Sequence, residues 1–531
     1  MYKNGLLTII GLLLFAGIAR AQETADGRWL DEETWQPRNQ HATVYNMPRS
    51  GGDWPVLATD WGDDIRLTFF DDPRAHNPEI AVYGDNVYVT WFKLYEEKVY
   101  FLRSTNGGEA WFENVQISDS STYRAVMPQI SAWGDNVYVV YRAWRPYQGI
   151  YLKRSTDKGA TWQETQSLYY TARNFGEKPV AASMANMVFI VFRVWVDLAP
   201  PDDSDLFFVR SSDFGVTWSD TLFVSDTTDI GLGPDLSLNG GGLHLIRGEN
   251  LSSAVTEIIY NRSTDQGDSW SGCYILSHYD TSGSFWPQIA AWGDSNVIVS
   301  WTDYKYSPYE WTGDAFICRS TDNGETWSQP IQMTDLHLVK ATDISADGDT
   351  VLLTYSDYRY GDREIIANAS YDGGVTWEGE ERLTNALGQS VEPSCEVGGG
   401  IAHVTWCDGR LNPEHAFYEV YYKRGDLQTG ISEPDLDFPL SDRIVSNYPN
   451  PFNSSTTITL NYSEGGDVSI RIYDIIGRLI RELNAIDKEG GEIKAAWDAR
   501  DNSGKEVSSG VYFARIGANN HSSTIKLLYL R

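Results

Sequence analysis

Residues 154–162 have the sequence RSTDKGATW, and near-copies of this stretch recur along the chain. The other copies are RSTNGGEAW at 103–111, RSSDFGVTW at 210–218, RSTDQGDSW at 262–270, RSTDNGETW at 319–327 and ASYDGGVTW at 369–377. Their final tryptophans are 51, 56, 52, 57 and 50 residues apart. A self-similar period of this length is typical of solenoids and propellers, in which each repeat is one supersecondary unit.

A second motif keeps the same period and predicts a β-hairpin. Stretches such as PEIAVYGDNVYVTW from Pro78 and PQISAWGDNVYVVY from Pro128 place apolar residues on both sides of a Gly-Asp turn. Further copies start at Pro179, Pro234, Pro287, Thr342 and Pro393. With one more strand before and one after each RSTD turn, every unit should contain four short strands, which is the composition of a propeller blade.

The repeats predict an all-β, seven-bladed propeller over residues 55–425, with six or eight blades as alternatives. The hairpin motif occurs seven times but the RSTD turn only six, and the last unit lacks a fourth strand. DDIRLT at 63–68 precedes the first hairpin and is similar to GEERLT at 379–384. We expect 63–68 to lie beside 418–424 and to complete the last blade, which would remove the free sheet edge of a linear array.

The repeated turn resembles the Asp box, S-x-D-x-G-x-T-W, of sialidases and related propellers. The matching aspartates are Asp157, Asp213, Asp265, Asp322 and Asp372, and the first turn has Asn106 at this position. The resemblance implies the propeller fold and a structural role for these residues. The physical reason is local, because an Asp side chain accepts backbone N–H bonds within its own turn.

The two ends of the chain differ from the repeat region. Residues 1–21 combine Lys3, an apolar run and a small-x-small ending, which predicts a cleaved signal peptide. Residues 426–446 break the period and predict a linker. Alternation in residues 447–531, as in TTITLNY and VSIRIYD, predicts a small immunoglobulin-like β-sandwich.

This last domain resembles the type A C-terminal sorting domain of type IX secretion cargo. The matching stretches are YPNPFN at 448–453, YDIIGRLI at 473–480 and SGVYFARI at 509–516. The resemblance implies that the type IX secretion machinery is a partner, and that the protein passes through the periplasm to the medium or the outer cell surface. A carbohydrate-binding or spacer sandwich is the alternative.

Composition excludes several classes of protein. The formal net charge is −31, so binding of nucleic acid through a general basic surface is excluded. The apolar run within 1–21 is too short for a membrane span, and we expect no transmembrane segment.

No metal or nucleotide motif is present, so we expect neither a metal nor another cofactor. Cys395 and Cys407 fall on neighbouring predicted strands and form either a disulfide or two buried free thiols.

The loops between the second and third strands of each unit contain the candidate ligand-binding residues. These are Arg142, Trp144, Arg193, Trp195, Arg247, Asp303, Asp357, Arg359, Asp408 and Arg410. Aromatic faces stack on sugars, and the Arg fork pairs with carboxylates. We therefore expect recognition of an extracellular glycan or another surface polymer. Some of the Asp–Arg pairs could instead be ion pairs that tie blades together.

Two other functions remain open. Sialidases hold the substrate carboxylate with three arginines, and Arg142, Arg193 and Arg247 could imitate such a triad. The R-I-P signature of that family is missing, because the sequence before Pro78 is Arg-Ala-His-Asn. A sialidase-like glycoside hydrolase is thus one alternative, with unassigned catalytic residues, and a non-catalytic protein-binding scaffold is the other.

Overall fold

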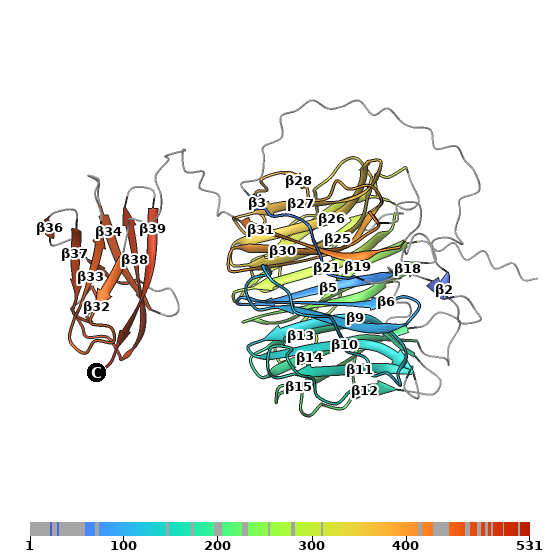
Figure 1. The fold of residues 1–531 in the computed structure, drawn as a ribbon, viewed down its shortest axis with the longest axis horizontal. Coiled ribbons are helices and arrows are strands. Elements are labelled where there is room, and N and C mark those ends of the chain that lie inside the picture. The colour runs from blue at the N-terminus through green and yellow to red at the C-terminus, as the bar shows by residue number, and fades with distance from the viewer. Residues whose placement is uncertain are drawn as a thin grey trace, which may run out of the picture. The chain divides into compact units, whose positions relative to one another are not determined.

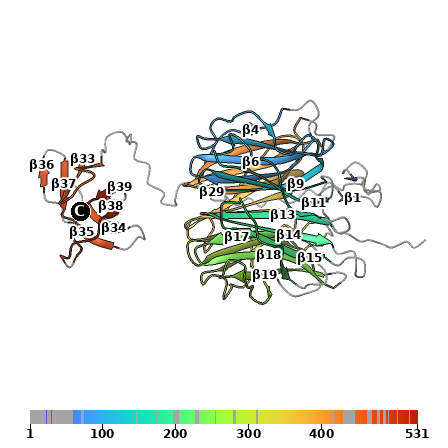
Figure 2. The ribbon, with the colours of Figure 1, turned by 90° about the horizontal axis from the view of Figure 1, so that it is seen from below.

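The structure is a computed structural model with two compact units, Met1–Gly430 and Ile431–Arg531 (Figures 1 and 2). The residues that it describes are 22–23, 29–30, 59–69, 74–144, 148–170, 175–195, 204–225, 232–252, 255–277, 282–308, 312–411, 417–427, 445–461, 468–474, 479–483, 487–489, 492–502, 504–518 and 521–531. The predicted signal peptide, residues 1–21, lies outside these ranges, as does most of the predicted linker.

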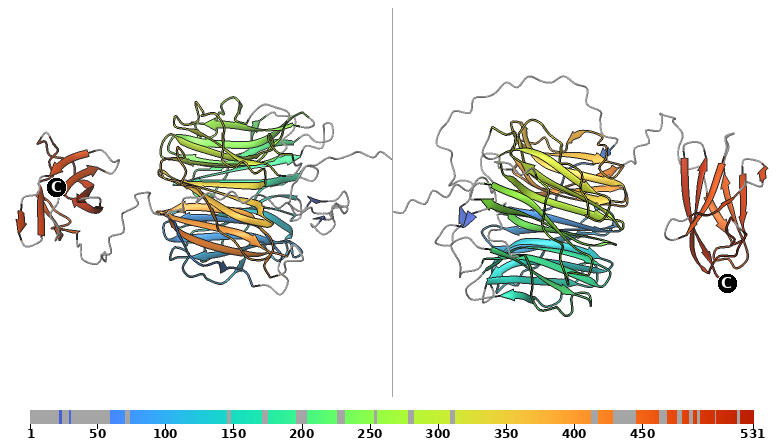
Figure 3. Two further views of the ribbon diagram at one scale, coloured as in Figure 1. Left: turned by 90° about the horizontal axis from the view of Figure 1, so that it is seen from above. Right: turned by 180° about the vertical axis from the view of Figure 1, so that it is seen from behind.

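Every element within the described residues is a β-strand, so the all-β fold class is confirmed. In the described part of the first unit, seven antiparallel sheets follow one another along the chain (Figure 3). The first strands of the sheets are β5 (Ala75–Tyr83), β9 (Tyr123–Trp133), β13 (Phe175–Met184), β17 (Leu232–Asn239), β21 (Ser284–Trp292), β25 (Val339–Asp347) and β29 (Ser390–Gly398). The second strands are β6 (Asn86–Lys93), β10 (Asn136–Trp144), β14 (Met187–Trp195), β18 (Gly242–Ser252), β22 (Asn296–Asp303), β26 (Thr350–Tyr360) and β30 (Ile401–Asp408).

The outer half of each sheet is built in the same order. The third strands are β7 (Lys98–Ser104), β11 (Gln148–Ser155), β15 (Ser204–Ser211), β19 (Val255–Ser263), β23 (Asp314–Ser320), β27 (Asp362–Ser370) and β31 (Glu419–Leu427). The fourth strands are β8 (Val115–Gln116), β12 (Gln166–Tyr170), β16 (Leu222–Ser225), β20 (Tyr274–Ile275), β24 (Ile331–Gln332) and β28 (Glu380–Arg382). A separate pair near the N-terminus joins β1 (Gln22–Glu23) to β2 (Trp29–Leu30).

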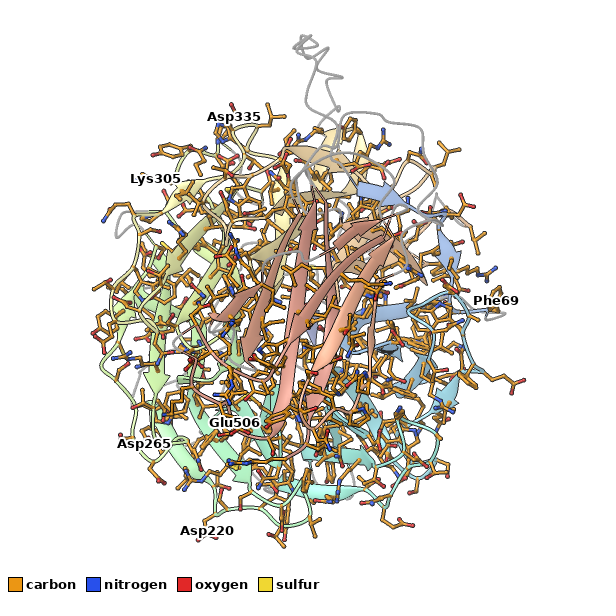
Figure 4. The ribbon with its side chains drawn as sticks, turned by 90° about the vertical axis from the view of Figure 1, so that its left-hand side faces the viewer. Phe69, Asp220, Asp265, Lys305, Asp335 and Glu506 are labelled. Atoms are coloured by element: carbon orange, nitrogen blue, oxygen red, sulfur yellow. The ribbon has the colours of Figure 1, made fainter. Side chains whose placement is uncertain are left out.

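The sheets surround an axis, which is the arrangement of a propeller. Each first strand contacts the first strand of the next sheet, and β29 of the last sheet contacts β5 of the first. Figure 4 views the molecule along this axis, with Asp220, Asp265, Asp335 and Phe69 at the rim. The first strands therefore lie innermost and the fourth strands outermost.

The N-terminal segment completes the last sheet, as predicted. β4 (Ile65–Arg66) pairs antiparallel with β31, so that Arg66 lies opposite Tyr421 and Ile65 opposite Tyr422. β3 (Thr59–Trp61) pairs with the end of the same strand. The predicted position of residues 63–68 beside 418–424 is confirmed, and the ring closes through pairing of its two ends.

Large side chains fill the spaces between neighbouring sheets. The ring of Trp162, at the end of an RSTD turn, packs edge-on against Phe101 of the preceding sheet, with 4.8 Å between centroids. Trp111 of the first sheet packs against Tyr422 of the last sheet in the same way, at 4.9 Å. Such aromatic pairs bury much apolar area and add about 1 kcal/mol of pair energy. The joint that closes the ring thus uses the same packing as a joint inside it.

The aspartate of the RSTD turn stabilises the backbone of its own turn. The N–H and hydroxyl of Thr161 donate to the two carboxylate oxygens of Asp157 at 2.8 and 2.6 Å. Gly159 has φ 74°, and its N–H donates to Ser155 Oγ at 2.9 Å. Equivalent bonds are made by Asp213, Asp265, Asp322 and Asp372. Bonds donated by Ser269 lower the pKa of Asp265 to about 2.

The second unit contains two four-stranded antiparallel sheets in its described part. One sheet contains, in spatial order, β32 (Val445–Tyr448), β33 (Thr456–Asn461), β37 (Glu492–Trp497) and β36 (Asp487–Glu489). The other contains β35 (Leu479–Leu483), β34 (Val468–Asp474), β38 (Gly510–Ala518) and β39 (His521–Tyr529). Buried side chains of both sheets, including Ile458, Ile472 and Trp497, form one apolar core.

The disulfide considered for Cys395 and Cys407 is not formed. Both are buried free thiols. They lie on the paired strands β29 and β30, but Cys395 is opposite Val404 and Cys407 is opposite Val391. This register separates the two sulfur atoms, although the residues are close in sequence.

Candidate functional site

A cavity of about 120 Å³ lies on the axis, where the first strands meet. All of the first strands from β5 to β29 contribute to its lining, together with Ser356 of β26 and Arg363 of β27. A single buried water needs about 10–15 Å³. The cavity is therefore large enough for a cluster of waters or for part of a polar ligand.

Each first strand bulges where it reaches the cavity. In the first sheet, Asn77 and Pro78 together lie opposite the single residue Trp91 of β6. The same two-for-one irregularity occurs at the prolines of five other first strands, namely Pro128, Pro179, Pro234, Pro287 and Pro393. β25 has a one-residue irregularity at Lys340. Bulges bend a strand and redirect its side chains, which here turns the strand starts toward the axis.

Carboxylates in the lining connect one sheet to the next. Asp235 of β17 accepts the Ile289 N–H of β21 at 2.9 Å, and Asp343 of β25 accepts the Cys395 N–H of β29 at 2.7 Å. Burial, opposed by these hydrogen bonds, raises the pKa of Asp235 to about 7 and that of Asp343 to about 6. Burial and the charge of Asp343 raise the pKa of Glu396 to about 8. Acidic groups near the axis therefore titrate close to neutral pH.

Basic and aromatic side chains share the lining with these acids. Lys178, Lys340 and Arg363 all border the cavity, although the chain as a whole is strongly acidic. Arg363 Nε donates to Gln389 at 2.7 Å. Trp286 lines the cavity and belongs to an aromatic group with Phe285, at 5.7 Å between ring centroids. The lining thus includes an aromatic residue beside hydrogen-bonding groups of both charges.

The predicted ligand-binding aspartates are buried within their own sheets. Asp408 is 1% exposed, accepts the indole N–H of Trp406 at 2.8 Å and pairs with Arg410 at 2.7 Å. Arg410 also pairs with Asp64 beside β4 at 2.7 Å, so it helps to attach the closing segment.

Two further sheets repeat this arrangement. Asp303, at the end of β22, accepts the indole N–H of Trp301 at 3.1 Å. Asp357 of β26 pairs with Arg359 at 2.6 Å, and Arg359 also pairs with Glu380 of β28. The contact between Arg359 and Glu380 joins two strands of one sheet, and the other contacts lie within a single strand.

Three of the five predicted arginines are also buried, namely Arg142, Arg193 and Arg247. Arg193 Nε donates to Ser204 at 2.9 Å, and Arg142 is 6% exposed. The side chain of Arg247 is fully buried and pairs with Glu249 at 2.9 Å. It occupies the position opposite the bulge of its sheet, where the first sheet has Trp91.

The two predicted tryptophans differ in what is described. Trp144 packs against Tyr123, with 5.6 Å between ring centroids. Trp195 is the last residue of β14, and its side chain lies outside the described part of the chain. None of the ten predicted residues is among the described residues that line the cavity, so their role in ligand binding stays a prediction.

The ten predicted residues do not include those that line the cavity. The signal was present, because the repeated proline marks the bulge and the residue before it reaches the axis. Among the described residues, no group of three or more His, Cys, Asp or Glu side chains is placed to hold a metal ion. The described residues also contain no helix long and apolar enough to span a membrane.

Comparisons with known proteins find similarity in both units. A sialidase from Bacteroides fragilis (strain YCH46) is 23% identical over 286 residues, which cover 46% of this chain and 51% of that protein. The chain thus spans about half the length of this curated relative. An ulvan lyase, described as a new family of polysaccharide lyase, aligns with a TM-score of 0.48 and 11% identity over 67% of this chain and 95% of that one. A sialidase from Streptococcus pneumoniae aligns with a TM-score of 0.39 and 11% identity, covering 67% and 69%.

The second unit matches a known family over almost its whole described length. Residues 446–529 match the family described as Secretion system C-terminal sorting domain. This match agrees with the resemblance found in YPNPFN and the stretches that follow it. The protein therefore contains a type IX sorting domain and is secreted or held at the outer cell surface.

Proposed function

We propose that the protein recognises an extracellular glycan, or another surface polymer rich in hydroxyl groups, at the mouth of the cavity on the axis. In this proposal the seven sheets are the blades of a seven-bladed propeller, and the sorting domain is an immunoglobulin-like sandwich that exports it. The observation that carries the proposal is the lining itself, to which every first strand contributes.

The chemistry of the lining supports a sugar as the ligand. Sugar rings present apolar C–H faces that stack on aromatic rings, and Trp286 provides such a ring. Their hydroxyl groups donate and accept hydrogen bonds, and Gln129, Gln288 and Asp235 provide both kinds of partner. Ligand sites are usually concave, with few polar groups around an apolar surface. The sialidase relative from Bacteroides fragilis adds support from a protein named for its action on glycans.

A glycan array probed with the purified, labelled protein tests this proposal. We expect binding to a restricted set of glycans, and we expect Trp286→Ala to weaken it at least tenfold. Trp133→Ala is the matched control, because Trp133 is a partly exposed tryptophan at the far end of its first strand, next to the hairpin turn. Binding that both variants lose equally, or that neither loses, would contradict the placement of the ligand at the cavity.

Glycoside hydrolysis is the second candidate function. It is favoured by the carboxyl groups of Asp235 and Asp343, whose raised pKa values suit proton transfer near neutral pH. It is disfavoured by the buried positions of Arg142, Arg193 and Arg247, which do not line the cavity. A fluorogenic sialoside assay separates the two candidates. Turnover by the wild-type protein that Asp235→Asn abolishes would replace recognition with catalysis, whereas array binding without turnover supports recognition.

A further inference from the structure

The residues before the cavity prolines share an unusual backbone conformation. Asn77, Met127, Lys178, Trp286 and Glu392 each precede a proline, and their φ angles are 48°, 53°, 46°, 52° and 53°. These residues come from β5, β9, β13, β21 and β29, and all of them border the cavity. The same local geometry is therefore built repeatedly around one axis.

This conformation is unfavourable for the residues that adopt it. A positive φ brings the Cβ atom close to the backbone, and a following proline favours extended backbone instead. Glycine adopts positive φ at no such cost. If these bulges were needed only to shape the backbone, glycine would be the most favourable residue at each position. Non-glycine residues that keep the strained, positive φ beside a cavity therefore indicate a role for their side chains.

The neighbouring sheet leaves room for one of these side chains. β17 has Gly233 before its proline, and a Cβ atom there would lie 2.2 Å from Cδ of Lys178. The aliphatic stem of Lys178 thus occupies the space that a side chain at residue 233 would need. This places the Lys178 side chain across the joint between β13 and β17, beside the cavity.

The five side chains have different chemistry at equivalent positions. The Glu392 carboxylate accepts the Asn77 N–H at 2.7 Å, which links the last sheet to the first. The other four are an amide, a thioether, an ammonium and an indole. The backbone geometry that they share cannot require such different groups.

We propose that Asn77, Met127, Lys178 and Trp286 are the specificity-determining residues of the cavity, here called the axial residues. The inference rests on the proposed function and names the residues that select the glycan. The amide and ammonium bond to sugar hydroxyls, while the indole and thioether contact the apolar faces of the ring. Strained backbone at each position is retained because the side chain contributes to binding.

The test replaces each axial residue with glycine in the purified full chain. Glycine removes the side chain and relieves the positive φ at the same time. We expect Asn77→Gly and Lys178→Gly to keep or raise the Tm measured by calorimetry, and to weaken binding of the best array glycan at least tenfold. Trp286→Phe and Lys178→Arg keep the chemistry in part, so we expect partial binding and a changed order of preferred glycans.

Matched controls come from the RSTD turns. Lys158→Gly and Gln266→Gly relieve the same kind of strain, since their φ angles are 59° and 61°, but they lie in exposed turns away from the cavity. We expect both controls to keep the wild-type glycan profile. Unchanged binding in all axial variants would overturn the inference and leave the proposed function standing. Loss of binding accompanied by a large fall in Tm would also overturn it, and a wild-type protein that binds no glycan would overturn both proposals.

Discussion

The closing segment at residues 63–68 has an internal copy, and the pair allows a controlled test of ring closure. Leu67 is 3% exposed, and its N–H donates to Val420 O at 2.9 Å. Leu383, the equivalent residue of the sixth sheet, is 4% exposed, and its N–H donates to Ile365 O at 2.8 Å. Leu67 is far from its sheet in sequence, whereas Leu383 belongs to the unit that it completes.

The expected magnitude follows from burial. Replacing a buried leucine with alanine removes apolar surface and leaves a cavity, at a cost of about 3 kcal/mol. A unit of roughly 370 residues that unfolds in one step has an unfolding entropy of about 0.8 kcal/mol/K, so this loss lowers the Tm by about 4 °C. If β4 closes the ring, Leu67→Ala and Leu383→Ala should lower the Tm by similar amounts.

Calorimetry measures both variants beside Leu387→Ala, which changes a side chain that is 78% exposed and should leave the Tm unchanged. Hydrogen exchange adds a local readout. Peptides from β31 should exchange faster in Leu67→Ala, because β4 and Leu67 protect that strand. A Tm of Leu67→Ala within 1 °C of wild type, together with a clear fall for Leu383→Ala, would refute closure by the N-terminal segment.

Three other outcomes are expected. Maleimide should label only Cys273 in the native protein and four thiols after unfolding, since Cys273 is exposed and Cys318, Cys395 and Cys407 are buried and free; mass spectrometry would detect any other pattern. Because burial raises the pKa of Glu396 to about 8, the folded protein binds a proton at this residue more tightly than the unfolded chain does. The stability gained in this way is fully present below the ordinary carboxyl pKa and is lost as the pH rises through about 8. Glu396→Gln should therefore raise the Tm at pH 9 and leave it nearly unchanged at pH 4, and an equal shift at both pH values would contradict this account. A chain ending at Leu427 lacks the sorting domain, so it should fold and accumulate in the periplasm; full extracellular levels on immunoblots of cell fractions would contradict the sorting role.

Two features that repeated residue patterns encode were predictable from the sequence. The bonds around Asp157 are completed within a few residues, so the RSTD pattern alone identifies the turn. The copy of GEERLT at 63–68 was enough to predict the pairing of β4 with β31. In both cases a short residue pattern identifies the contacts that its residues make, and the repeat provides several copies of that pattern for comparison.

The candidate site was less predictable, because strand register and orientation decide where a side chain lies. Arg247 and Asp408 were predicted to lie in loops, but Arg247 lies in the middle of β18 and Asp408 is the last residue of β30. Both are buried among partners in their own sheets. Lys178 and Trp286 each directly precede the proline that starts a copy of the hairpin motif, and both border the cavity at the bulge formed with that proline.

The sequence by itself determined the repeat, the four-stranded unit, the closing segment and the sorting domain, because each is encoded in a short residue pattern that can be recognised along the chain. Only the tertiary structure decided which side chains meet on the axis. Asn77 and Trp286 are more than two hundred residues apart, and they border one cavity only because the ring is closed and its first strands meet at the axis. Convergence of this kind depends on the curvature of the whole ring, which no single repeat contains.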